Sequence, residues 1–504
     1  MLGRLFKGAS SSEDYFLGGK SFGWFSLSLS TAATQISAIS FISAPAFVGL
    51  KEGGGMMWLT YEFAVPLAML FLLAFLIPPM YRAGVVSVYE FLERRFGSST
   101  RVLLSGVFQI SRAFATSVMV YTVALILTSV MNIPMWQTIL IIGVVTLIYS
   151  YQGGMKAVVY GDVIQMIILF GGILICFGMG LHYLGGWESF TAQVDPSRLK
   201  AVDFSSLGLQ KGEEFGFWPM LIGGLFLYTS YYGTDQSQVQ RLFSAQDMAT
   251  VKKTLLVNGL MRFPITLIYC VMGLILGTMV ATNSDFRALI PADKPDLMIP
   301  IFIREYLPHG IIGILMVAIL SATMSSLSST INSLSAATME DFFNRRKQLS
   351  VGQYNRYSRY AVLFWGLVCL VLAFFTGDIA KTVIEAINKI GSVFYGPILA
   401  TFVAAIGWKR IHTLGANMGL VLGVLVNVYL WLFVPEVFWF WWNAVGAIVT
   451  LLTAYVISVL VPAPNKTTEQ ILDFRWEADL TKTVVLIGFF ILIVIVSISF
   501  PNWI

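Results

Sequence analysis

Charge is what this 504-residue sequence has least of. Asp, Glu, Lys and Arg make up 12% of its residues, whereas 57% are hydrophobic, and the mean hydropathy is +0.77. Soluble globular domains carry about 25% charged residues, so this composition predicts a polytopic membrane protein with the lipid bilayer as a partner. The net charge of +5 reflects the loops that flank the membrane, and no nucleic-acid partner is needed to explain it.

Cysteine and histidine are equally scarce, with three residues of each type. All three cysteines fall inside apolar segments, so they are expected to be small buried side chains and not a disulfide framework. The histidines are scattered at the ends of apolar segments, where they form no nucleophile–base pair or metal cluster. The sequence therefore does not indicate an enzyme, and no obligate protein partner is evident.

Apolar segments separated by short polar breaks recur along the whole chain. Each is close to the roughly 20 residues that a helix needs to cross the hydrocarbon core. The alternating pattern of a membrane β-barrel is missing, so we expect an all-α bundle with about thirteen spans. The segments lie near 22–50, 57–83, 100–131, 134–152, 155–184, 214–241, 252–282, 300–340, 358–376, 381–407, 413–434, 437–461 and 482–500.

Lys and Arg are distributed unevenly over the predicted loops. Alternate loops, such as those from Arg82 to Arg101, from Arg241 to Lys253 and from Arg345 to Arg359, hold more of them than the loops between. The positive-inside rule then predicts a cytoplasmic N-terminus in a multi-pass protein of the plasma or inner membrane. Met1–Lys20 contains neither a signal peptide nor a complete span, so we expect a segment to be missing before it.

A hydroxyl-rich segment of membrane-spanning length runs from Ala318 to Asp341. Uncharged oxygens suit a small monovalent cation that must bind and then leave. Close packing of small residues between helices would explain the same composition, so both interpretations remain open. At helical spacing, one face of the segment collects Ala322, Ser325, Ser326, Ser329 and Ser333.

Two spans five helices apart look interrupted. The first, Gly23 to Gly49, is rich in Ser and Thr, contains Pro45 and is expected to break near Thr34–Ala38. The sixth, Phe217 to Arg241, has little continuous apolar sequence. Broken helices in corresponding positions are typical of an inverted five-helix repeat with the binding site between its halves. The expected organisation is an N-terminal segment, two five-helix repeats around an extracellular loop, and accessory C-terminal helices, at 1–21, 22–184, 185–213, 214–407 and 408–504.

Six motifs, in this order and spacing, resemble the sodium/solute symporter family, which includes the sodium/glucose and sodium/sialic acid transporters. The match covers nearly the whole chain and implies an amino-acid/sodium symporter-like fold. Members usually carry a further span before the first motif, which this sequence lacks. The motifs are Asp14-Tyr-Phe-Leu-Gly-Gly-Lys-Ser21, Gln35-Ile-Ser-Ala-Ile-Ser-Phe-Ile42, Val88-Tyr-Glu-Phe-Leu-Glu-Arg-Arg-Phe96, Tyr151-Gln-Gly-Gly-Met-Lys156 with Gly161-Asp-Val-Ile-Gln165, Asp235-Gln-Ser-Gln-Val-Gln-Arg241 and Thr338-Met-Glu-Asp-Phe342.

The resemblance implies one or two coupling Na⁺ ions, bound between the broken first helix and the serine-rich helix. For the first ion, the implied ligands are the carbonyls of Ala33, Ile36 and Ala322 with the hydroxyls of Ser325 and Ser326. A second site, used by only some relatives, would take Asp162, Ser328 and Ser329. The alternative for Asp162 is a solvated carboxylate at the membrane interface.

For the solute, the resemblance and the cost of intramembrane charge bring together Ser40, Tyr61, Glu62, Arg112, Tyr231 and Asn388. Tyr61, Glu62 and Asn388 match positions that bind sugar hydroxyls. Arg112 matches the arginine that holds the carboxylate in the sialic-acid branch, and Arg262 offers a second donor fork. The alternative for Arg112 is an intramembrane ion pair with Glu62 or Asp235.

The function expected from these residues is Na⁺-coupled symport of a small polar organic solute by alternating access, with a sugar or polyol favoured. An organic anion, such as sialic acid or a monocarboxylate, and an amino acid are the alternatives. An ion channel would need pore rings or a repeated selectivity loop, which the sequence lacks. A membrane sensor is the other alternative from a different class, and no fused signalling domain supports it.

Overall fold

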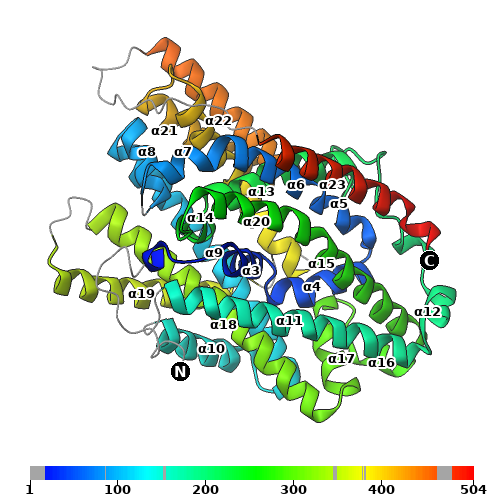
Figure 1. The fold of residues 1–504 in the computed structure, drawn as a ribbon. Coiled ribbons are helices and arrows are strands. Elements are labelled where there is room, and N and C mark those ends of the chain that lie inside the picture. The colour runs from blue at the N-terminus through cyan, green and yellow to red at the C-terminus, as the bar shows by residue number, and fades with distance from the viewer. Residues whose placement is uncertain are drawn as a thin grey trace.

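The computed structural model describes residues 17–85, 87–150, 155–343, 349–376, 379, 382–461 and 479–504. Across these ranges the chain is predominantly helical and forms no β-strand, and a β-bridge joins Phe22 to Ala245. The expected all-α bundle is therefore confirmed (Figure 1).

The helices up to residue 198 are η1 (Gly18–Lys20), α3 (Trp24–Gln35), α4 (Ala38–Gly49), η2 (Met56–Trp58), α5 (Leu59–Glu62), α6 (Ala64–Phe71), η3 (Leu72–Leu76), α7 (Ile77–Arg82), α8 (Val88–Phe96), α9 (Ser98–Met131), α10 (Met135–Ser150), α11 (Met155–Leu184), α12 (Trp187–Gln193) and η4 (Pro196–Arg198). Those that follow are α13 (Phe217–Thr234), α14 (Gln236–Phe243), α15 (Met248–Thr282), α16 (Ser284–Leu289), η5 (Pro295–Leu297), α17 (Met298–Tyr306), α18 (His309–Thr338), η6 (Met339–Phe343), α19 (Val351–Ala373), α20 (Val383–Gly407), α21 (Thr413–Phe433), α22 (Phe440–Leu460), α23 (Leu480–Ser499) and η7 (Phe500–Asn502).

The number of membrane spans differs from the expectation. Within the described ranges, nine helices are long and apolar enough to cross a membrane, or ten if the bent pair α3 and α4 is one span. The count of thirteen is therefore not confirmed, although every expected segment contains helix. The segment 300–340 is two helices, because Pro308 has an extended backbone (ψ 142°) and separates α17 from α18.

Both expected helix interruptions are present, and a side chain restarts each helix. Between α3 and α4 the axis bends by 53°, and Ile36 (ψ 78°) and Ser37 (ψ −177°) leave helical geometry. The Ser37 hydroxyl accepts a hydrogen bond from the Ile39 N–H at 3.2 Å and so caps α4. Between α13 and α14, Asp235 is extended (ψ 122°), and its carboxylate accepts from the Ser237 N–H at 2.9 Å. The break within residues 34–38 is thus confirmed.

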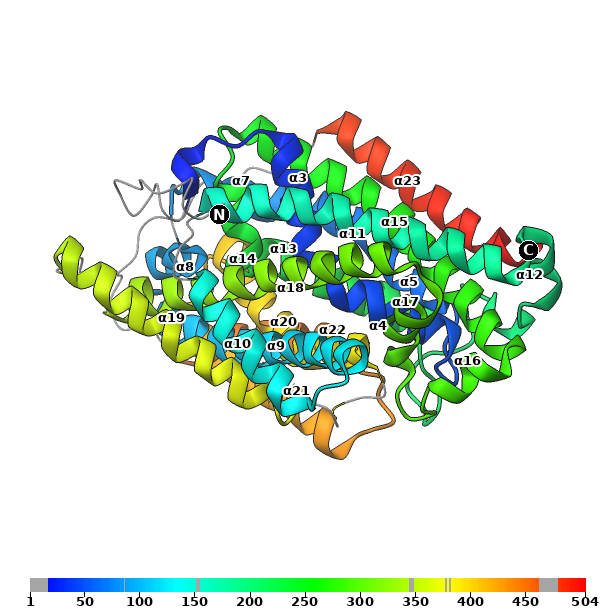
Figure 2. The same ribbon diagram turned by 90° about the horizontal axis from the view of Figure 1, so that it is seen from below.

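Long helices surround the two interruptions. α3 packs on α11, α11 on α18 and α4 on α15, while α13 packs against α20 and α22. α11 and α18 lie side by side in both ribbon views, and α23 runs along one flank of the bundle (Figures 1 and 2). The interrupted helices α3, α4, α13 and α14 therefore lie in the interior, where exposed backbone groups can face a cavity.

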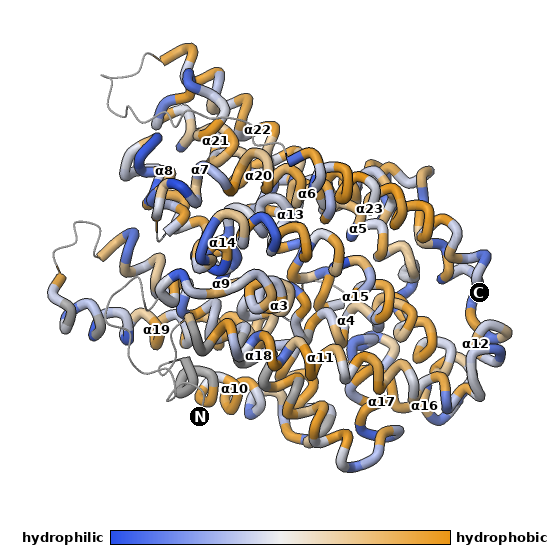
Figure 3. The backbone as a smooth tube through the Cα atoms, in the orientation of Figure 1, coloured by the Kyte–Doolittle hydropathy of each residue, from blue (hydrophilic) through white to orange (hydrophobic). Residues whose placement is uncertain are grey.

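Hydropathy follows this arrangement with one exception. Hydrophobic residues dominate the long helices, and hydrophilic residues gather at α8, around α12 and on α14 (Figure 3). α14 is the exception, because all eight of its residues are buried although its sequence, Gln-Ser-Gln-Val-Gln-Arg-Leu-Phe, is mostly polar. A polar helix in the interior must find its partners within the protein, and these partners are part of the site.

Candidate functional site

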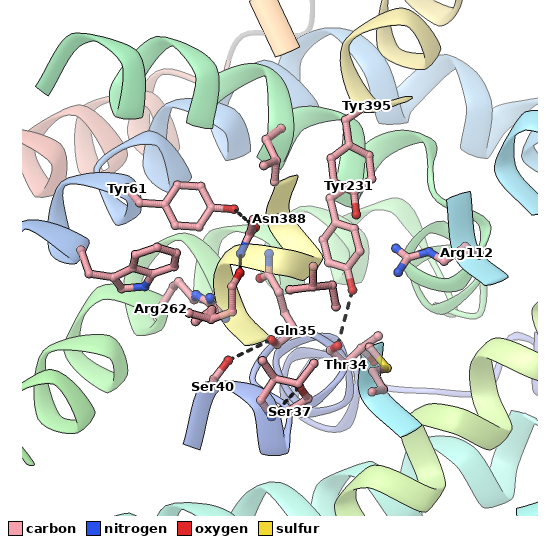
Figure 4. Close-up of a pocket in the computed structure, with 16 residues that line it drawn as sticks. Thr34, Gln35, Ser37, Ser40, Tyr61, Arg112, Tyr231, Arg262, Asn388 and Tyr395 are labelled. Atoms are coloured by element: carbon pink, nitrogen blue, oxygen red, sulfur yellow. Dashed lines mark hydrogen bonds between the residues drawn. The ribbon is translucent and has the colours of Figure 1, made fainter. Parts of the chain in front are cut away.

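A small cavity of about 70 Å³ lies beside the break between α3 and α4. Five of the six residues expected to bind the solute line it: Ser40, Tyr61, Arg112, Tyr231 and Asn388 (Figure 4). They come from α4, α5, α9, α13 and α20, so chain folding gathers them from five separate helices. The lining therefore draws residues from both segments expected to form the five-helix repeats, 22–184 and 214–407, and the division into repeats stays a prediction.

The wall of the cavity beside α5 is aromatic with polar tips. The Tyr61 hydroxyl donates to Oδ1 of Asn388 at 3.3 Å, and its ring stacks on Tyr228 with centroids 4.5 Å apart. The Tyr231 hydroxyl donates to the carbonyl oxygen of Thr34 at 3.4 Å, next to the helix break. Because Tyr231 touches both the cavity and the break, it connects the solute position with the non-helical backbone.

Glu62, the sixth expected residue, is not among the residues that line the cavity. It is fully buried and pairs side-on with Arg262 of α15, with Nε to Oε2 at 2.9 Å and Nη2 to Oε1 at 3.2 Å. Arg262 does line the cavity, and its Nη1 is buried without a hydrogen-bond partner among the described residues. The arginine of this pair, and not the carboxylate, therefore faces the cavity.

Arg112 is held in a similar way on the other side of the cavity (Figure 4). Its guanidinium pairs with the buried carboxylate of Asp235, at the break between α13 and α14, and lies 4.8 Å from the centre of the Tyr231 ring. The ion pair with Asp235 was one of the two interpretations of Arg112. Arg112 nevertheless lines the cavity, so pairing and solute contact are compatible.

The charges around the cavity are asymmetric. Its lining contains two arginines, Arg112 and Arg262, and no Asp or Glu. Their carboxylate partners, Asp235 and Glu62, lie behind them, so the local charge sums to zero while the cationic groups face inwards. Binding of an anion alone or of a cation alone would leave a net charge in this buried region, which is costly in a low dielectric. Binding of an anion together with a cation would keep the region neutral.

The expected ligands of the first Na⁺ lie on two helices. Ala33 and Ile36 are buried at the end of α3, where the chain leaves helical geometry. Ser326 is buried on α18, and Ala322 and Ser325 lie on the same helix, with side chains outside the described part. Carbonyl oxygens at a helix break and hydroxyls on a facing helix fit a monovalent cation, and this ligand set stays a proposal.

The residues expected at a second Na⁺ are engaged with an arginine. Oδ2 of Asp162, on α11, accepts from the Ser30 hydroxyl at 2.6 Å and from Nη2 of Arg241 at 2.8 Å. The same Nη2 donates to the Ser329 hydroxyl at 3.1 Å. Ser328 is buried nearby on α18. Asp162 is 2% exposed, so the alternative of a solvated interfacial carboxylate does not hold.

Arg262, Trp58, Gln35 and Tyr395 also line the cavity but were not in the expected solute-binding set. Arg262 carried a signal, because an arginine inside a span needs a partner or a function. Trp58 and Tyr395 carried none, since aromatic residues are common in apolar helices. The role of Arg241 at Asp162 was also missed, because the two residues are 79 positions apart.

Two solved structures have a similar fold. A structure described as the substrate-bound outward-open state of a Na⁺-coupled sialic acid symporter matches with a TM-score of 0.80 and 24% identity, over 92% of this chain and 96% of that one. MhsT in complex with L-phenylalanine matches with a TM-score of 0.53 and 15% identity, over 86% and 98%. This chain therefore shares its fold with a Na⁺-coupled symporter and with MhsT.

The sequence comparison identifies the family. The sodium:solute symporter family matches residues 15–423, and this chain belongs to that family. It is a multi-pass membrane transporter and not an enzyme. It is 28% identical to the sodium/iodide cotransporter of Homo sapiens and 30% identical to the sodium-coupled monocarboxylate transporter 1 of Mus musculus, each over 84% of this chain. The chain spans 65% and 68% of the length of these two relatives.

Proposed function

We propose that this protein couples the inward movement of Na⁺ to the uptake of a small organic anion, a monocarboxylate, by alternating access. One observation carries the choice of solute. The buried Nη1 of Arg262 has no hydrogen-bond partner among the described residues and lies in the lining of the cavity, while its counter-ion Glu62 lies outside that lining. A carboxylate oxygen would satisfy this donor with a charge-assisted hydrogen bond.

The lining favours an anion over the other classes. An amino acid would bring an ammonium group, and no Asp or Glu lines the cavity to balance its charge beside two arginines. A sugar needs several acceptors as well as donors, and Glu62, the acceptor that first favoured a sugar, is bound to Arg262. The relatives that are named for monocarboxylates and for iodide also support a negatively charged solute.

The size of the cavity favours a small member of the class. A volume of about 70 Å³ is small beside the roughly 300–1,000 Å³ of pockets that hold drug-sized ligands. Its aromatic wall, formed in part by Trp58 and Tyr61, suits the short apolar chain of a monocarboxylate. A sugar or polyol remains the second candidate, because Tyr61 and Asn388 are hydrogen-bonded to each other at the cavity and both could turn to bind hydroxyls.

Coupling follows from where the two cargo species would bind. Na⁺ at Ala33, Ile36, Ala322, Ser325 and Ser326 would hold the broken helix α3–α4 against α18. Tyr231 contacts the carbonyl of Thr34 beside that break and also lines the cavity. Na⁺ binding would thus fix the conformation of the backbone at the break, which Tyr231 contacts. The solute would then bind more tightly to the conformational state that Na⁺ favours.

The test is uptake by the full-length chain in proteoliposomes with a Na⁺ gradient and radiolabelled lactate. Competition by pyruvate, butyrate, iodide, sialic acid, glucose and proline identifies the class. We expect uptake that depends on Na⁺ and is inhibited by pyruvate and butyrate more strongly than by glucose or proline. Uptake of glucose in preference to every anion would contradict the proposal, and so would uptake that continues with choline in place of Na⁺ under a proton gradient.

A further inference from the structure

We propose that the guanidinium of Arg241 is a built-in cation that takes the place of a second Na⁺ at Asp162, so that this protein couples one Na⁺ to each solute. The proposal deepens the proposed function and rests on it only where the charge of the solute enters. In this proposal, Arg241 determines how many Na⁺ ions are transported with each solute molecule. The ligand set of Asp162, Ser328 and Ser329 then no longer serves a second ion.

The position of one nitrogen atom is the first argument. Nη2 of Arg241 lies 2.8 Å from Oδ2 of Asp162 and 3.1 Å from Oγ of Ser329, which are two of the three ligands expected for the second ion. A hard cation binds oxygen ligands at about 2.3–2.6 Å, so it would need the space that Nη2 occupies. The amino group and the ion are therefore mutually exclusive in this arrangement.

The remaining contacts hold the guanidinium in place. Its Nε donates to the Ser30 hydroxyl on α3 at 2.9 Å, and Nη1 donates to the carbonyl of Ser237 within α14. The Ser30 hydroxyl in turn donates to Oδ2 of Asp162 at 2.6 Å. The arginine thereby joins α3, α11, α14 and α18 through a single buried group, so displacing it would break contacts to four helices.

Burial and charge give the second argument. Arg241 is 1% exposed and Asp162 is 2% exposed, so the pair is removed from water. Together they are neutral, and adding Na⁺ would leave a net positive charge at a buried position. Displacing the arginine would instead leave a guanidinium without its counter-ion, which is also costly. Both routes disfavour a second ion while Arg241 is bound to Asp162.

The first sodium site keeps its own ligands under this assignment. Arg241 contacts Ser329, which lies one helical turn beyond Ser326 on α18. Ala33 and Ile36 lie about one and two turns, respectively, beyond Ser30, which bonds to Asp162 and Arg241 from the middle of α3. A tethered cation at one position and a mobile Na⁺ at the other can therefore coexist.

The experiment is equilibrium binding of ²²Na⁺ to the purified full-length chain in nanodiscs, without any solute. We expect the wild-type chain to bind one Na⁺. Arg241→Gln keeps hydrogen-bonding groups but removes the charge and frees Asp162, so binding should rise to two. Arg241→Lys, which keeps a tethered charge, should stay at one. Arg241→Gln combined with Asp162→Asn should return to one, because the carboxylate is then absent.

Two results would overturn the proposal. One is a wild-type chain that binds two Na⁺ and loses one in Asp162→Asn. The other is an Arg241→Gln variant that elutes as a folded, monodisperse species and still binds one. If Arg241→Gln does not fold, the proposal is tested by the number of Na⁺ ions that the wild-type chain and the double variant bind. Because no solute is present, failure of the monocarboxylate assignment would leave these counts unchanged, and the two proposals fail separately.

Discussion

The carboxylate of Asp296 accepts a hydrogen bond from the backbone N–H of Val383 at 2.9 Å, which ties η5 to the first turn of α20. Its Oδ1 is buried with no hydrogen-bond partner among the described residues. Burial raises the pKa of Asp296 to about 6, although hydrogen bonds from Ser43 and from the Val383 N–H favour the carboxylate. The first turn of the helix that carries Asn388 is thus held by a carboxylate that titrates at mildly acidic pH.

This pKa predicts how stability depends on pH. The folded-state pKa lies above the value of 3.8 for an ordinary Asp, so the folded protein binds more protons between about pH 4 and 6, and this contribution to stability falls as pH rises through that range. Asp296→Asn removes the titration. We expect its free energy of unfolding relative to wild type to be higher at pH 7.5 than at pH 4.5 by about 1–3 kcal/mol, at about 1.4 kcal/mol per pKa unit, and thermal melts at the two pH values measure this change. Asp293→Asn, at an exposed position, is the matched control, and an equal pH dependence in both variants would contradict the assignment.

The first sodium site predicts a loss of ion affinity without a loss of folding. Ser325→Ala with Ser326→Ala removes two neutral oxygens that the resemblance assigns to the ion. A hydrogen bond to a charged group is worth about 1.5–3 kcal/mol, so we expect at least a tenfold rise in the Na⁺ concentration for half-maximal uptake. Thr330→Ala is the control on the same helix, because its hydroxyl donates to the Ser326 carbonyl oxygen at 2.9 Å and not to an expected ion position. Unchanged Na⁺ dependence in the double variant would exclude these ligands.

The buried pair of Glu62 and Arg262 predicts selectivity. Changing both to Gln keeps a hydrogen-bonded pair and leaves no buried charge unpaired, so the chain should fold. The donor facing the cavity then loses its charge, and we expect the apparent affinity for lactate to fall about five- to thirtyfold, since charge-assisted bonds exceed neutral ones by about 1–2 kcal/mol. Competition binding measures this change. An unaltered affinity for lactate would show that Arg262 does not hold the carboxylate.

The two proposals together predict transport without net charge. One Na⁺ entering with one monocarboxylate moves no charge, so lactate uptake should produce no current on a solid-supported membrane and should not respond to an imposed potential. By contrast, a second Na⁺ would add about 2.3 kcal/mol of driving force per 100 mV. Arg241→Gln is the matched comparison and should become electrogenic. A wild-type current that scales with lactate flux would contradict the single-ion stoichiometry.

Close packing of α4 against α15 predicts a sensitive glycine. A Cβ on Gly277 would lie 2.5 Å from the carbonyl oxygen of Gly49, and one on Gly273 would lie 2.6 Å from that of Pro45. Backbone atoms cannot move aside cheaply, so Gly277→Ala should separate α4 from α15 and cost about 1–3 kcal/mol of stability, as overpacking does. Gly488→Ala on α23, where no atom lies within 4 Å of the new Cβ, is the control. Equal thermal stability of the two variants would contradict this view of the contact.

The sequence by itself determined the class of fold and identified five residues that the fold brings together at one cavity. Low charge and repeated apolar segments specify a helical membrane bundle because the bilayer leaves few other ways to satisfy the backbone. The break near residue 36 and an interruption within 217–241 were also foreseeable, since hydroxyl-rich and glycine-rich spans hold a continuous helix poorly. Five of six expected solute-binding residues line one cavity, because matched motifs fix positions on helices even before their packing is known.

Only the tertiary structure decided the ion pairs, and with them the charge that the cavity presents. From the sequence, Glu62 had Arg112 as a candidate partner, and Arg112 had both Glu62 and Asp235. The fold pairs Glu62 with Arg262 across 200 residues, Arg112 with Asp235 across 123, and Asp162 with Arg241 across 79. A buried carboxylate pairs with the cationic side chain that helix packing brings within about 3 Å of it. The separation of two residues in the sequence does not predict that distance. The packing of the helices likewise decides which member of an ion pair lines the cavity, as Arg112 and Arg262 do.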